Sequence, residues 1–250
     1  MKTRGNSRRV GLARTLSKLG YCSRSQAAEL IRAGRVKLNG TTRRDPETPV
    51  HVHSDHIEVD RLGVTAETRV YLMLNKPRGV VTSAADEKGR QTVYSFLSAS
   101  LPWVAPVGRL DKASEGLLLL TNDSQWAARI ANPKTHLEKT YHVQAGALVE
   151  ETFPAKLTKG IKTANGDVLC AKRASILRAG QRNTWLEIIL DEGKNRHIRR
   201  MFEASSMEVL RLVRIAIGPL LLGELAKGEC RALTSDEKRA LDQAMGTSSS

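Results

Sequence analysis

Apolar residues in the first part of the chain are spaced as in two short helices. Leucines recur every three or four residues over 12–19, and this spacing predicts a helix that ends at Gly20. Ser23 and Gln26 then match a capping box, in which two polar residues satisfy the first backbone N–H groups of a helix. The second helix is therefore predicted to begin there and to end at Gly34.

A short hairpin follows the two helices. The stretch RVKLNG alternates between apolar and polar residues like a strand and leads into a turn at Asn39 and Gly40. Two helices and a small hairpin-rich sheet make a compact α/β unit, which we place at residues 10–66. The charged residues 1–9 before it predict a flexible basic arm.

The rest of the chain has the pattern of one larger α+β domain, predicted at residues 67–244 and followed by a disordered tail at 245–250. Strands are predicted over YLMLNK, which breaks at Pro77 and resumes at Val80, and over LLLLTND, EKTYHVQAG and TWLEIIL. Helices are predicted over SQWAARIA and NRHIRRMFEA, the second with Asn195 as its N-cap.

The charge of the chain is strongly positive and unevenly distributed. The formal net charge is +14, which favours a polyanionic partner such as RNA. Residues 1–44 hold twelve Lys or Arg against a single acid, Glu29. Six of these bases are predicted to bind RNA: Arg14, Lys18, Arg24, Arg32, Arg35 and Lys37. The alternative is a solvated charged face, but such a face usually mixes both signs.

Composition disfavours membrane and disulfide-rich classes. No run approaches the ~20 apolar residues of a membrane span, so we expect a soluble, cytoplasmic protein with no membrane partner. The three cysteines are far apart and lack a C-x-x-C spacing. They predict buried spectators rather than a disulfide framework or a zinc site: Cys22, Cys170 and Cys230.

The histidines do not predict a metal site. His51, His53 and His56 lie in a segment that we predict as a polar edge strand, where the first two project to one face and the third to the other. No cysteine or fourth ligand accompanies them. A dinucleotide-type glycine pattern is also absent from the sequence, so no cofactor is predicted.

The stretch VGRLDKASEG places a carboxylate between two cations, directly before four leucines. Asp111 lies between Arg109 and Lys112, and the run LLLL follows. One interpretation is a solvated turn; the other is a carboxylate kept ionised as a nucleophile. Burial against apolar residues raises the pKa of a carboxyl group unless a cation holds it ionised. The second interpretation therefore needs a cation from elsewhere in the chain.

The predicted helix NRHIRRMFEA is amphipathic, with apolar residues along one face. Three arginines crowd the remaining surface: Arg196, Arg199 and Arg200. They repel one another unless anions meet them, and a substrate phosphate and Asp111 are the candidate anions. The alternative is an ordinary amphipathic helix.

Four motifs occur in the order LNKPRGVVTS, VGRLDKASEGLLLLTND, EKTYHV and EGKNRHIRRM. Together they resemble the pseudouridine synthases that act on ribosomal RNA, the RsuA-like group. The N-terminal unit resembles the small RNA-binding domain, or alpha-L motif, that these enzymes share with a small-subunit ribosomal protein. The resemblance implies a catalytic domain of the α+β class with a mixed, mainly antiparallel sheet flanked by helices.

The resemblance implies that a uridine in folded ribosomal RNA is isomerised to pseudouridine. The bond from the base nitrogen to the sugar breaks, the uracil rotates, and its carbon five joins the sugar. The target base must leave its stack to reach the enzyme. No cofactor or metal is implied, because no second substrate is consumed. The implied partner is ribosomal RNA or a ribosome-assembly intermediate, and we expect a monomer.

Site residues follow from the motifs. Asp111 matches the catalytic aspartate of the family, Arg199 the arginine that pairs with it, and Tyr141 the tyrosine that stacks on the target base. On this view the arginine keeps the carboxylate ionised in a dry site, where it attacks the sugar or stabilises charge there. Five further residues are predicted to bind the substrate: Arg109, Ile198, Lys76, Arg196 and Arg200.

Two positions depart from the family pattern, and two other functions stay open. His197 stands where glutamine is expected, which adds a group whose charge changes with pH, and Ser124 stands where glycine is expected. A non-catalytic ribosomal RNA-binding or assembly protein would need only the charge asymmetry. An RNA methyltransferase would need a glycine-rich loop after a first strand, which the sequence lacks.

Removing residues 1–65 should weaken RNA binding and make it less sensitive to salt, because contacts with phosphates produce most of the salt dependence. Affinity for ribosomal RNA, measured over a series of salt concentrations, checks this expectation. Full affinity with an unchanged slope would mean that the basic unit plays no part in capturing RNA.

Overall fold

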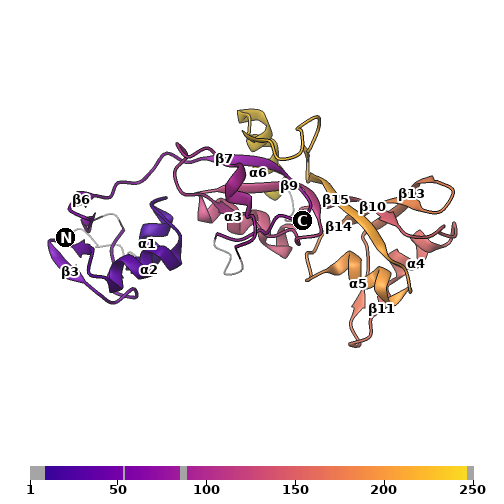
Figure 1. Ribbon diagram of the computed structural model, residues 1–250, viewed down its shortest axis with the longest axis horizontal. Coiled ribbons are helices and arrows are strands. Elements are labelled where there is room, and N and C mark those ends of the chain that lie inside the picture. Colours follow the sequence, from indigo (N-terminus) through magenta and orange to yellow (C-terminus); the bar gives the residue numbers. More distant parts are fainter. Residues whose placement is uncertain (1–8, 53, 85–88, 247–250) are drawn as a thin grey trace. The chain divides into compact units, whose positions relative to one another are not determined.

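The computed structural model describes three stretches of the chain: 9–52, 54–84 and 89–246. The chain divides into two compact units (Figure 1). The first unit runs to Val70 and includes the segments 98–105 and 121–124, and the second unit comprises the rest. The arm predicted at 1–9, apart from its last residue, and residues 247–250 of the tail lie outside the described residues.

The first unit contains the two predicted helices and a small antiparallel sheet. The helices are α1 (Leu12–Lys18) and α2 (Arg24–Arg32). The sheet has the order β3-β2-β5-β6, with the bounds Thr41–Arg43, Val36–Leu38, Ile57–Val59 and Leu62–Gly63. A two-stranded ladder joins β1 (Val10–Gly11) to β4 (Pro49–Val50). Apolar side chains from both helices and the sheet form one buried core.

Two local sequence signals in this unit are confirmed. Ser23 Oγ accepts a hydrogen bond from Gln26 N (3.1 Å), and Gln26 Oε1 accepts one from Ser23 N (3.0 Å). The capping box therefore begins α2 as predicted. Asn39 and Gly40 both have positive φ, 51° and 78°, and make the tight turn between β2 and β3.

The strand predicted for the histidine-rich segment HVHSDHIEVD is wrong in its first half. The backbone turns after β4, where the Asp55 carboxylate accepts a hydrogen bond from His51 N (2.8 Å). Strand β5 begins only at Ile57, so His56 precedes it, and His53 lies outside the described residues. A short acid that satisfies nearby backbone N–H groups favours a turn over an extended strand.

The second unit is built on a nine-stranded sheet, whose main order is β13-β14-β10-β15-β9-β7-β17. The bounds are β7 Tyr71–Lys76, β8 Ala105–Pro106, β9 Glu115–Thr121, β10 Lys139–Ala145, β13 Arg173–Ala179, β14 Thr184–Leu190, β15 Val209–Ile217, β16 Leu220–Leu221 and β17 Cys230–Ala232. Strand β10 is antiparallel to β14 and β15, whereas β15 and β9 are parallel. The predicted mixed, mainly antiparallel sheet is confirmed.

Helices cover two parts of this sheet over separate cores (Figure 1). The helices are α3 (Ser124–Ala131), α4 (Phe153–Lys159), α5 (His197–Ala204) and α6 (Ser235–Gly246), with 3-10 turns at Val93–Phe96 and Pro133–Thr135 and a small hairpin of β11 (Ile161–Lys162) and β12 (Val168–Leu169). Helices α4 and α5 pack with β10 and β14, and α3 and α6 pack with β7 and β9. Helix α6 extends two residues into the predicted tail.

Two predicted boundaries in the second unit are wrong. No strand resumes at Val80; instead Val81 makes an isolated bridge with Thr92. Asn195 does not cap α5, because Arg196 occupies the N-cap position. Arg196 has a left-handed backbone, with φ 49° and ψ 33°, and its side chain makes no capping hydrogen bond.

Gly116 lets β9 and β15 approach each other closely. It has a φ of +100°, and a Cβ atom there would lie 2.3 Å from Arg214 O and 2.8 Å from Arg214 N. Both the backbone conformation and the contact therefore require glycine at this position.

Gly116→Ala should lower the free energy of unfolding by about 3 kcal/mol or more, because the new methyl group displaces backbone in a fully buried strand. Urea unfolding followed by circular dichroism measures the loss. Gly166→Ala is the matched control: Gly166 also has a positive φ (+87°), but no atom lies within 4 Å of its added Cβ. Equal losses in the two variants would show that the approach of β9 to β15 is not constrained here.

Candidate active site

A cavity of about 430 Å³ in the second unit joins the loop before β9, the strand β10 and the start of α5. Five residues selected from the sequence line it: Arg109, Asp111, Tyr141, Arg196 and Ile198. Three others do not line it: Lys76, Arg199 and Arg200. The contacts of each residue show what it does instead.

Lys76, at the end of β7, holds the loop that carries Asp111. Its side chain is fully buried, and Nζ donates to the backbone oxygens of Pro77 (3.0 Å), Asp111 (3.2 Å) and Ser114 (2.8 Å). Burial lowers the pKa of Lys76 to about 8, and the carboxylates of Asp111 and Glu115 oppose that shift. Its place in the structure is that of a positioning residue rather than of a substrate ligand.

Main-chain and hydroxyl contacts fix the same loop from its other side. Gly79 N donates to Lys112 O (2.7 Å), and Thr82 Oγ1 donates to Leu110 O (2.8 Å). The residues before and after Asp111 are thus both tied to the segment that follows β7. This arrangement fixes the position from which the half-buried Asp111 side chain enters the cavity.

The guanidinium of Arg199 meets the Asp111 loop at its backbone. Arg199 is 9% exposed, Nη2 donates to Ala113 O (3.0 Å) and Nη1 to Val209 O (3.3 Å), while Nε has no partner. No hydrogen bond or ion pair joins the side chains of Arg199 and Asp111, both of which the structure describes. Burial, followed by Arg196, lowers the pKa of Arg199, and Asp111 raises it, so the two charges still interact.

Arg199 therefore differs from its prediction in the group that it contacts. It reaches the loop through a carbonyl oxygen two residues after the predicted carboxylate partner.

Tyr141 lies in the middle of the sheet. On β10 it is paired with Ile188 of β14 and with Arg214 of β15. It shares a strand face with Val143, which is buried beneath α4 and α5. The ring of Tyr141 packs partly against this core and borders the cavity.

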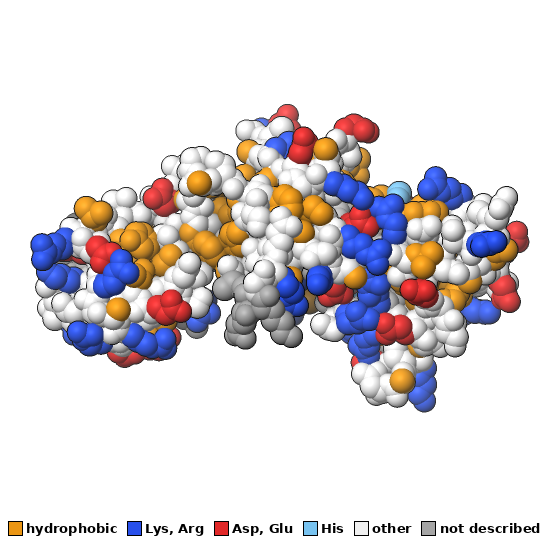
Figure 2. All heavy atoms as spheres, in the orientation of Figure 1, with side chains coloured by type: hydrophobic (Ala, Val, Ile, Leu, Met, Phe, Trp, Pro, Cys, Tyr) orange, Lys and Arg blue, Asp and Glu red, His pale blue; other side chains and the backbone are white. Residues whose placement is uncertain are grey.

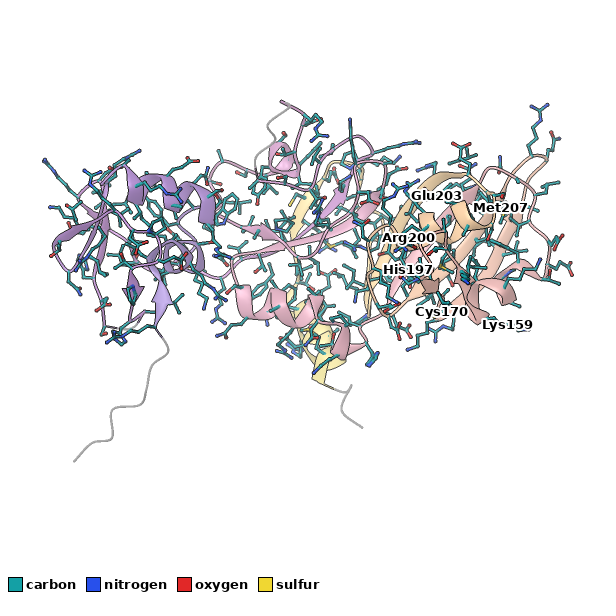
Figure 3. The ribbon with its side chains drawn as sticks, turned by 90° about the horizontal axis from the view of Figure 1, so that it is seen from below. Lys159, Cys170, His197, Arg200, Glu203 and Met207 are labelled. Carbon is teal, nitrogen blue, oxygen red and sulfur yellow. The ribbon has the colours of Figure 1, made fainter. Side chains whose placement is uncertain are left out.

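His197 lines the cavity from the start of α5, where Figure 3 labels it with Arg200 and Glu203 of the same helix. It is 3% exposed, and neither ring nitrogen makes a hydrogen bond of good geometry with described residues. Burial lowers the pKa of His197, although the Glu192 carboxylate and the Cys170 backbone favour its protonated form. This shift favours the uncharged ring, so burial opposes the charge that the departure from glutamine could add to the cavity.

The other two arginines of α5 have protein partners. Arg196 pairs with Glu203 and keeps an exposed side chain at the cavity. Arg200 donates to Asn165 Oδ1 (2.8 Å) and pairs with Asp167, both in the turn between β11 and β12. Arg200 ties α5 to this hairpin, and its guanidinium is not part of the cavity wall.

Basic side chains are numerous on the first unit, with acidic ones between them (Figure 2). The predicted RNA-binding residues come from α1, α2 and the start of the sheet: Arg14, Lys18, Arg24, Arg32, Arg35 and Lys37. Of these, Arg35 makes a bidentate ion pair with Asp60, in which two guanidinium nitrogens donate to the two carboxylate oxygens. The other five side chains form no ion pair with a described acidic residue and lie exposed or half-buried.

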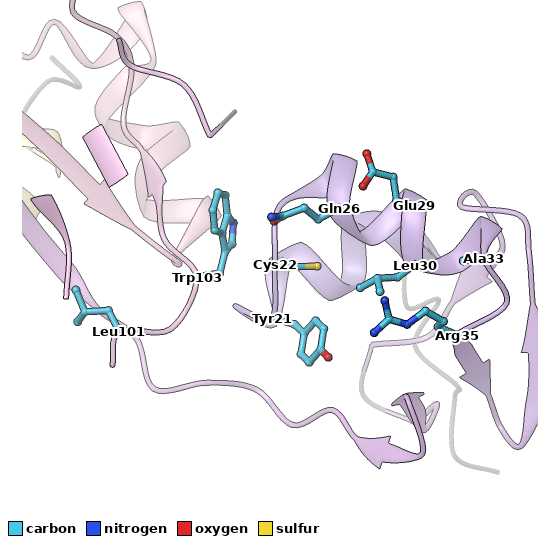
Figure 4. Close-up of a pocket in the computed structure, with 9 residues that line it drawn as sticks. All are labelled: Tyr21, Cys22, Gln26, Glu29, Leu30, Ala33, Arg35, Leu101 and Trp103. Carbon is cyan, nitrogen blue, oxygen red and sulfur yellow. The ribbon is translucent and has the colours of Figure 1, made fainter. Parts of the chain in front are cut away.

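A second cavity of about 590 Å³ lies within the first unit (Figure 4). Residues of α2 line it together with Tyr21 and with Leu101 and Trp103 of the segment 98–105. Trp103 N donates to Gly20 O (3.0 Å), which holds that segment beside the end of α1. Neither Tyr21 nor Trp103 was predicted from the sequence as a site residue.

Neither cysteine nor histidine forms a metal centre in the described part of the chain. No group of three His, Cys, Asp or Glu side chains is arranged to hold a metal among the described residues. The cysteines are free thiols, and Cys170 is exposed, so the prediction that all three are buried is wrong. None of the helices in the described stretches has the length and apolar character needed to cross a bilayer.

Three cations that line the cavity were not predicted from the sequence: Lys139, Lys194 and Arg214. Lys139 stands two positions before Tyr141 in the motif EKTYHV. Arg214 interrupts the buried face of β15 between Leu212 and Ala216. A charged residue at a buried strand position was the signal that could have found it, because such residues are rarely buried without a reason.

Comparison with known proteins gives consistent matches over the chain. The family described as RNA pseudouridylate synthase matches residues 70–204, and the S4 domain matches 10–57. The chain is 38% identical over 231 residues to the ribosomal large subunit pseudouridine synthase B of Bacillus subtilis, covering 92% of this chain and 94% of the relative. An uncharacterized RNA pseudouridine synthase of Aquifex aeolicus is 37% identical, covering 95% of each chain. A crystal structure of a pseudouridylate synthase matches with a TM-score of 0.65 and 35% identity, covering 93% of this chain and 99% of that one.

Lys76→Met should change how stability depends on pH. The pKa of Lys76 is about 8 in the folded protein and 10.5 without its surroundings, so the unfolded chain binds more protons between these values. Stability of the natural protein should therefore rise with pH from about 8 to 10.5, relative to the variant, by at most ~1.4 kcal/mol per pH unit. Urea unfolding at a series of pH values measures the difference. Parallel curves for the two proteins would contradict this assignment.

Proposed function

Because the chain belongs to the RNA pseudouridylate synthase family, we propose that it isomerises a uridine of ribosomal RNA to pseudouridine. The observation that carries the proposal is one cavity that holds Asp111, Tyr141 and Ile198 together. Ribosomal RNA as the substrate is supported by the name of the Bacillus relative and by the S4 domain.

Asp111 is the proposed catalytic carboxylate. It either attacks the sugar carbon that carries the base or stabilises charge that develops there. Lys76 supports this role by fixing the backbone of the loop, and Arg199 supports it by binding the Ala113 carbonyl and by its electrostatic interaction with the carboxylate. Arg199 thus acts by holding the loop and by its electrostatic attraction to the Asp111 carboxylate, without a direct ion pair.

Tyr141 and Ile198 are proposed to hold the target base. An aromatic ring and an apolar side chain in one cavity suit a flipped pyrimidine, which needs stacking after it leaves its helix. The exposed Arg109 and Arg196 are proposed to bind phosphates beside the target nucleotide. Arg200, which is committed to the hairpin turn, is proposed to act only by holding α5.

The first unit is proposed to capture the RNA. Its exposed bases supply contacts with phosphates that do not depend on sequence, and these contacts position the RNA rather than select the uridine. Bases from α1 and α2 are the proposed ligands, with Arg35 contributing less because Asp60 neutralises it.

The proposed reaction changes the atom through which the uracil is bonded to the sugar, from N1 to carbon five. It needs no oxidant and no second substrate, so we propose that the protein works without a cofactor or a metal. We further propose that it acts as a monomer in the cytoplasm, on ribosomal RNA or on a ribosome-assembly intermediate.

Asp111→Asn should lower turnover at least about 1,000-fold while leaving RNA affinity largely unchanged, because the amide keeps the shape but cannot supply the charge. Release of tritium from carbon five of uracil in ribosomal RNA measures turnover, and filter binding measures affinity. Asp236→Asn, which changes an exposed carboxylate on α6, is the control and should keep full turnover. Undiminished turnover by Asp111→Asn would overturn the proposed role. A natural protein that modifies no uridine would favour RNA binding alone.

A further inference from the structure

Arg214 is a buried cation in the wall of the active-site cavity. It is 6% exposed, and it extends from β15, which pairs with β10 in the sheet (Figure 1). Its Nε donates to Leu117 O (2.7 Å), while Nη2 is buried without a hydrogen-bond partner. A buried guanidinium with an unused donor is costly unless something else binds it.

The position of Arg214 places it beside the proposed base-binding residue. Arg214 is paired directly with Tyr141 across the β10–β15 ladder, so the two side chains share one face of the sheet. Both residues line the cavity together with Asp111. The guanidinium is therefore next to the region where the target base is proposed to lie.

Lys139 is a second cation that the sheet contributes to the same cavity. It begins β10, two residues before Tyr141, and lines the cavity with Arg214. Burial, together with the nearby Arg214, lowers the pKa of Lys139 to about 8, and Asp191 opposes the shift. Neither cation is within ion-pair distance of a carboxylate among the described residues. The two cations repel each other across a partly dry space, and an anion between them would relieve this repulsion.

A negatively charged base suits these two cations better than a phosphate does. The exposed side chains of Arg109 and Arg196 line the cavity and can bind phosphates that stay in water. Arg214 instead lies among apolar lining residues such as Leu212 and Ile217, where a strongly hydrated phosphate would lose its water. A flat anion with delocalised charge loses less on entering such a space.

We propose that Arg214 and Lys139 bind the uracil as an anion, between cleavage of its bond to the sugar and formation of the new one. This inference rests on the proposed function. The bond from N1 to the sugar carbon breaks with its electron pair on the base, and the two cations donate hydrogen bonds to the charged uracil oxygens. Carbon five then forms the new bond, its proton leaves, and N1 regains a proton, so the nucleotide keeps its composition.

Single-turnover kinetics with saturating protein test the catalytic part. Arg214→Met should slow conversion of uridine on the order of 100-fold, the loss typical of a removed anion-stabilising donor. RNA that carries 5-fluorouridine has fluorine in place of the proton on carbon five, so the comparison is made on loss of the starting nucleoside, which requires only that its bond from N1 to the sugar breaks. That loss should slow about 10-fold or less in Arg214→Met, because fluorine stabilises the departing anion by itself. Digestion to nucleosides and chromatographic separation of the isomers follow both substrates. Arg214→Lys, which keeps a cation, should recover part of the rate.

Arg178→Met is the matched control, because Arg178 is an exposed arginine of β13 that does not line the cavity. It should leave both rates unchanged. Equal slowing of the two substrates by Arg214→Met would overturn the proposal. Weaker RNA binding with an unchanged single-turnover rate would also overturn it, and would identify Arg214 as a phosphate ligand.

Binding of small pyrimidines tests the anion site without RNA. Barbiturate is a planar pyrimidine that is anionic at neutral pH, and uracil is its neutral counterpart. Isothermal titration should give tighter binding of barbiturate than of uracil or inorganic phosphate, and Arg214→Met should abolish this preference. A natural protein without the preference would overturn the proposal even if it modifies RNA. A natural protein with the preference that modifies no uridine would uphold the anion site and overturn the proposed function.

Discussion

The close approach of β9 to β15 at Gly116 determines where the chemistry of this protein takes place. The two strands are parallel there, and the backbone of Arg214 occupies the space that any side chain at position 116 would need. The loop that carries Asp111 leads directly into β9, and Tyr141 is paired with Arg214 on the other side of β15. One missing Cβ atom thus allows the carboxylate, the aromatic ring and the buried guanidinium to meet in one cavity.

Backbone carbonyl groups of the Asp111 loop, rather than side-chain carboxylates, accept the hydrogen bonds of Lys76 and Arg199. Lys76 and Arg199 both end on carbonyl oxygens of residues 111–114. A carbonyl fixes a cation's position without neutralising it, so positive charge remains close to Asp111 while the carboxylate stays available to the substrate. The loop is held rigidly, and its only carboxylate is not used up in holding it.

Elements encoded by neighbouring residues could be predicted from the sequence. The capping box at Ser23, the turn at Asn39 and Gly40 and the buried run that became β9 depend on contacts within a few positions, and all three are confirmed. The strand across His51 failed because the side chain of Asp55 satisfies the backbone in a turn. Periodicity cannot register a competing local hydrogen bond of this kind.

The site was predictable in part, because its motifs supplied residue types but not the partners that lie far along the chain. Asp111, Tyr141 and Ile198 were selected and do share a cavity. The contact of Arg199 with the Ala113 carbonyl depends on how α5 packs against a loop more than eighty positions earlier, and no local pattern encodes it. The place of Arg214 in the cavity likewise could not be predicted, because it depends on the pairing of β15 with β10.

Arg196, which lines the cavity, has a backbone conformation that its residue type disfavours. Its backbone is left-handed, a conformation that costs an ordinary residue roughly 1–2 kcal/mol and costs glycine almost nothing. The chain nevertheless places a long cation there and leaves the first turn of α5 without a side-chain cap. The backbone conformation at position 196 favours glycine, whereas the chain carries a cation there. Conflicts of this kind are concentrated at ligand-binding sites.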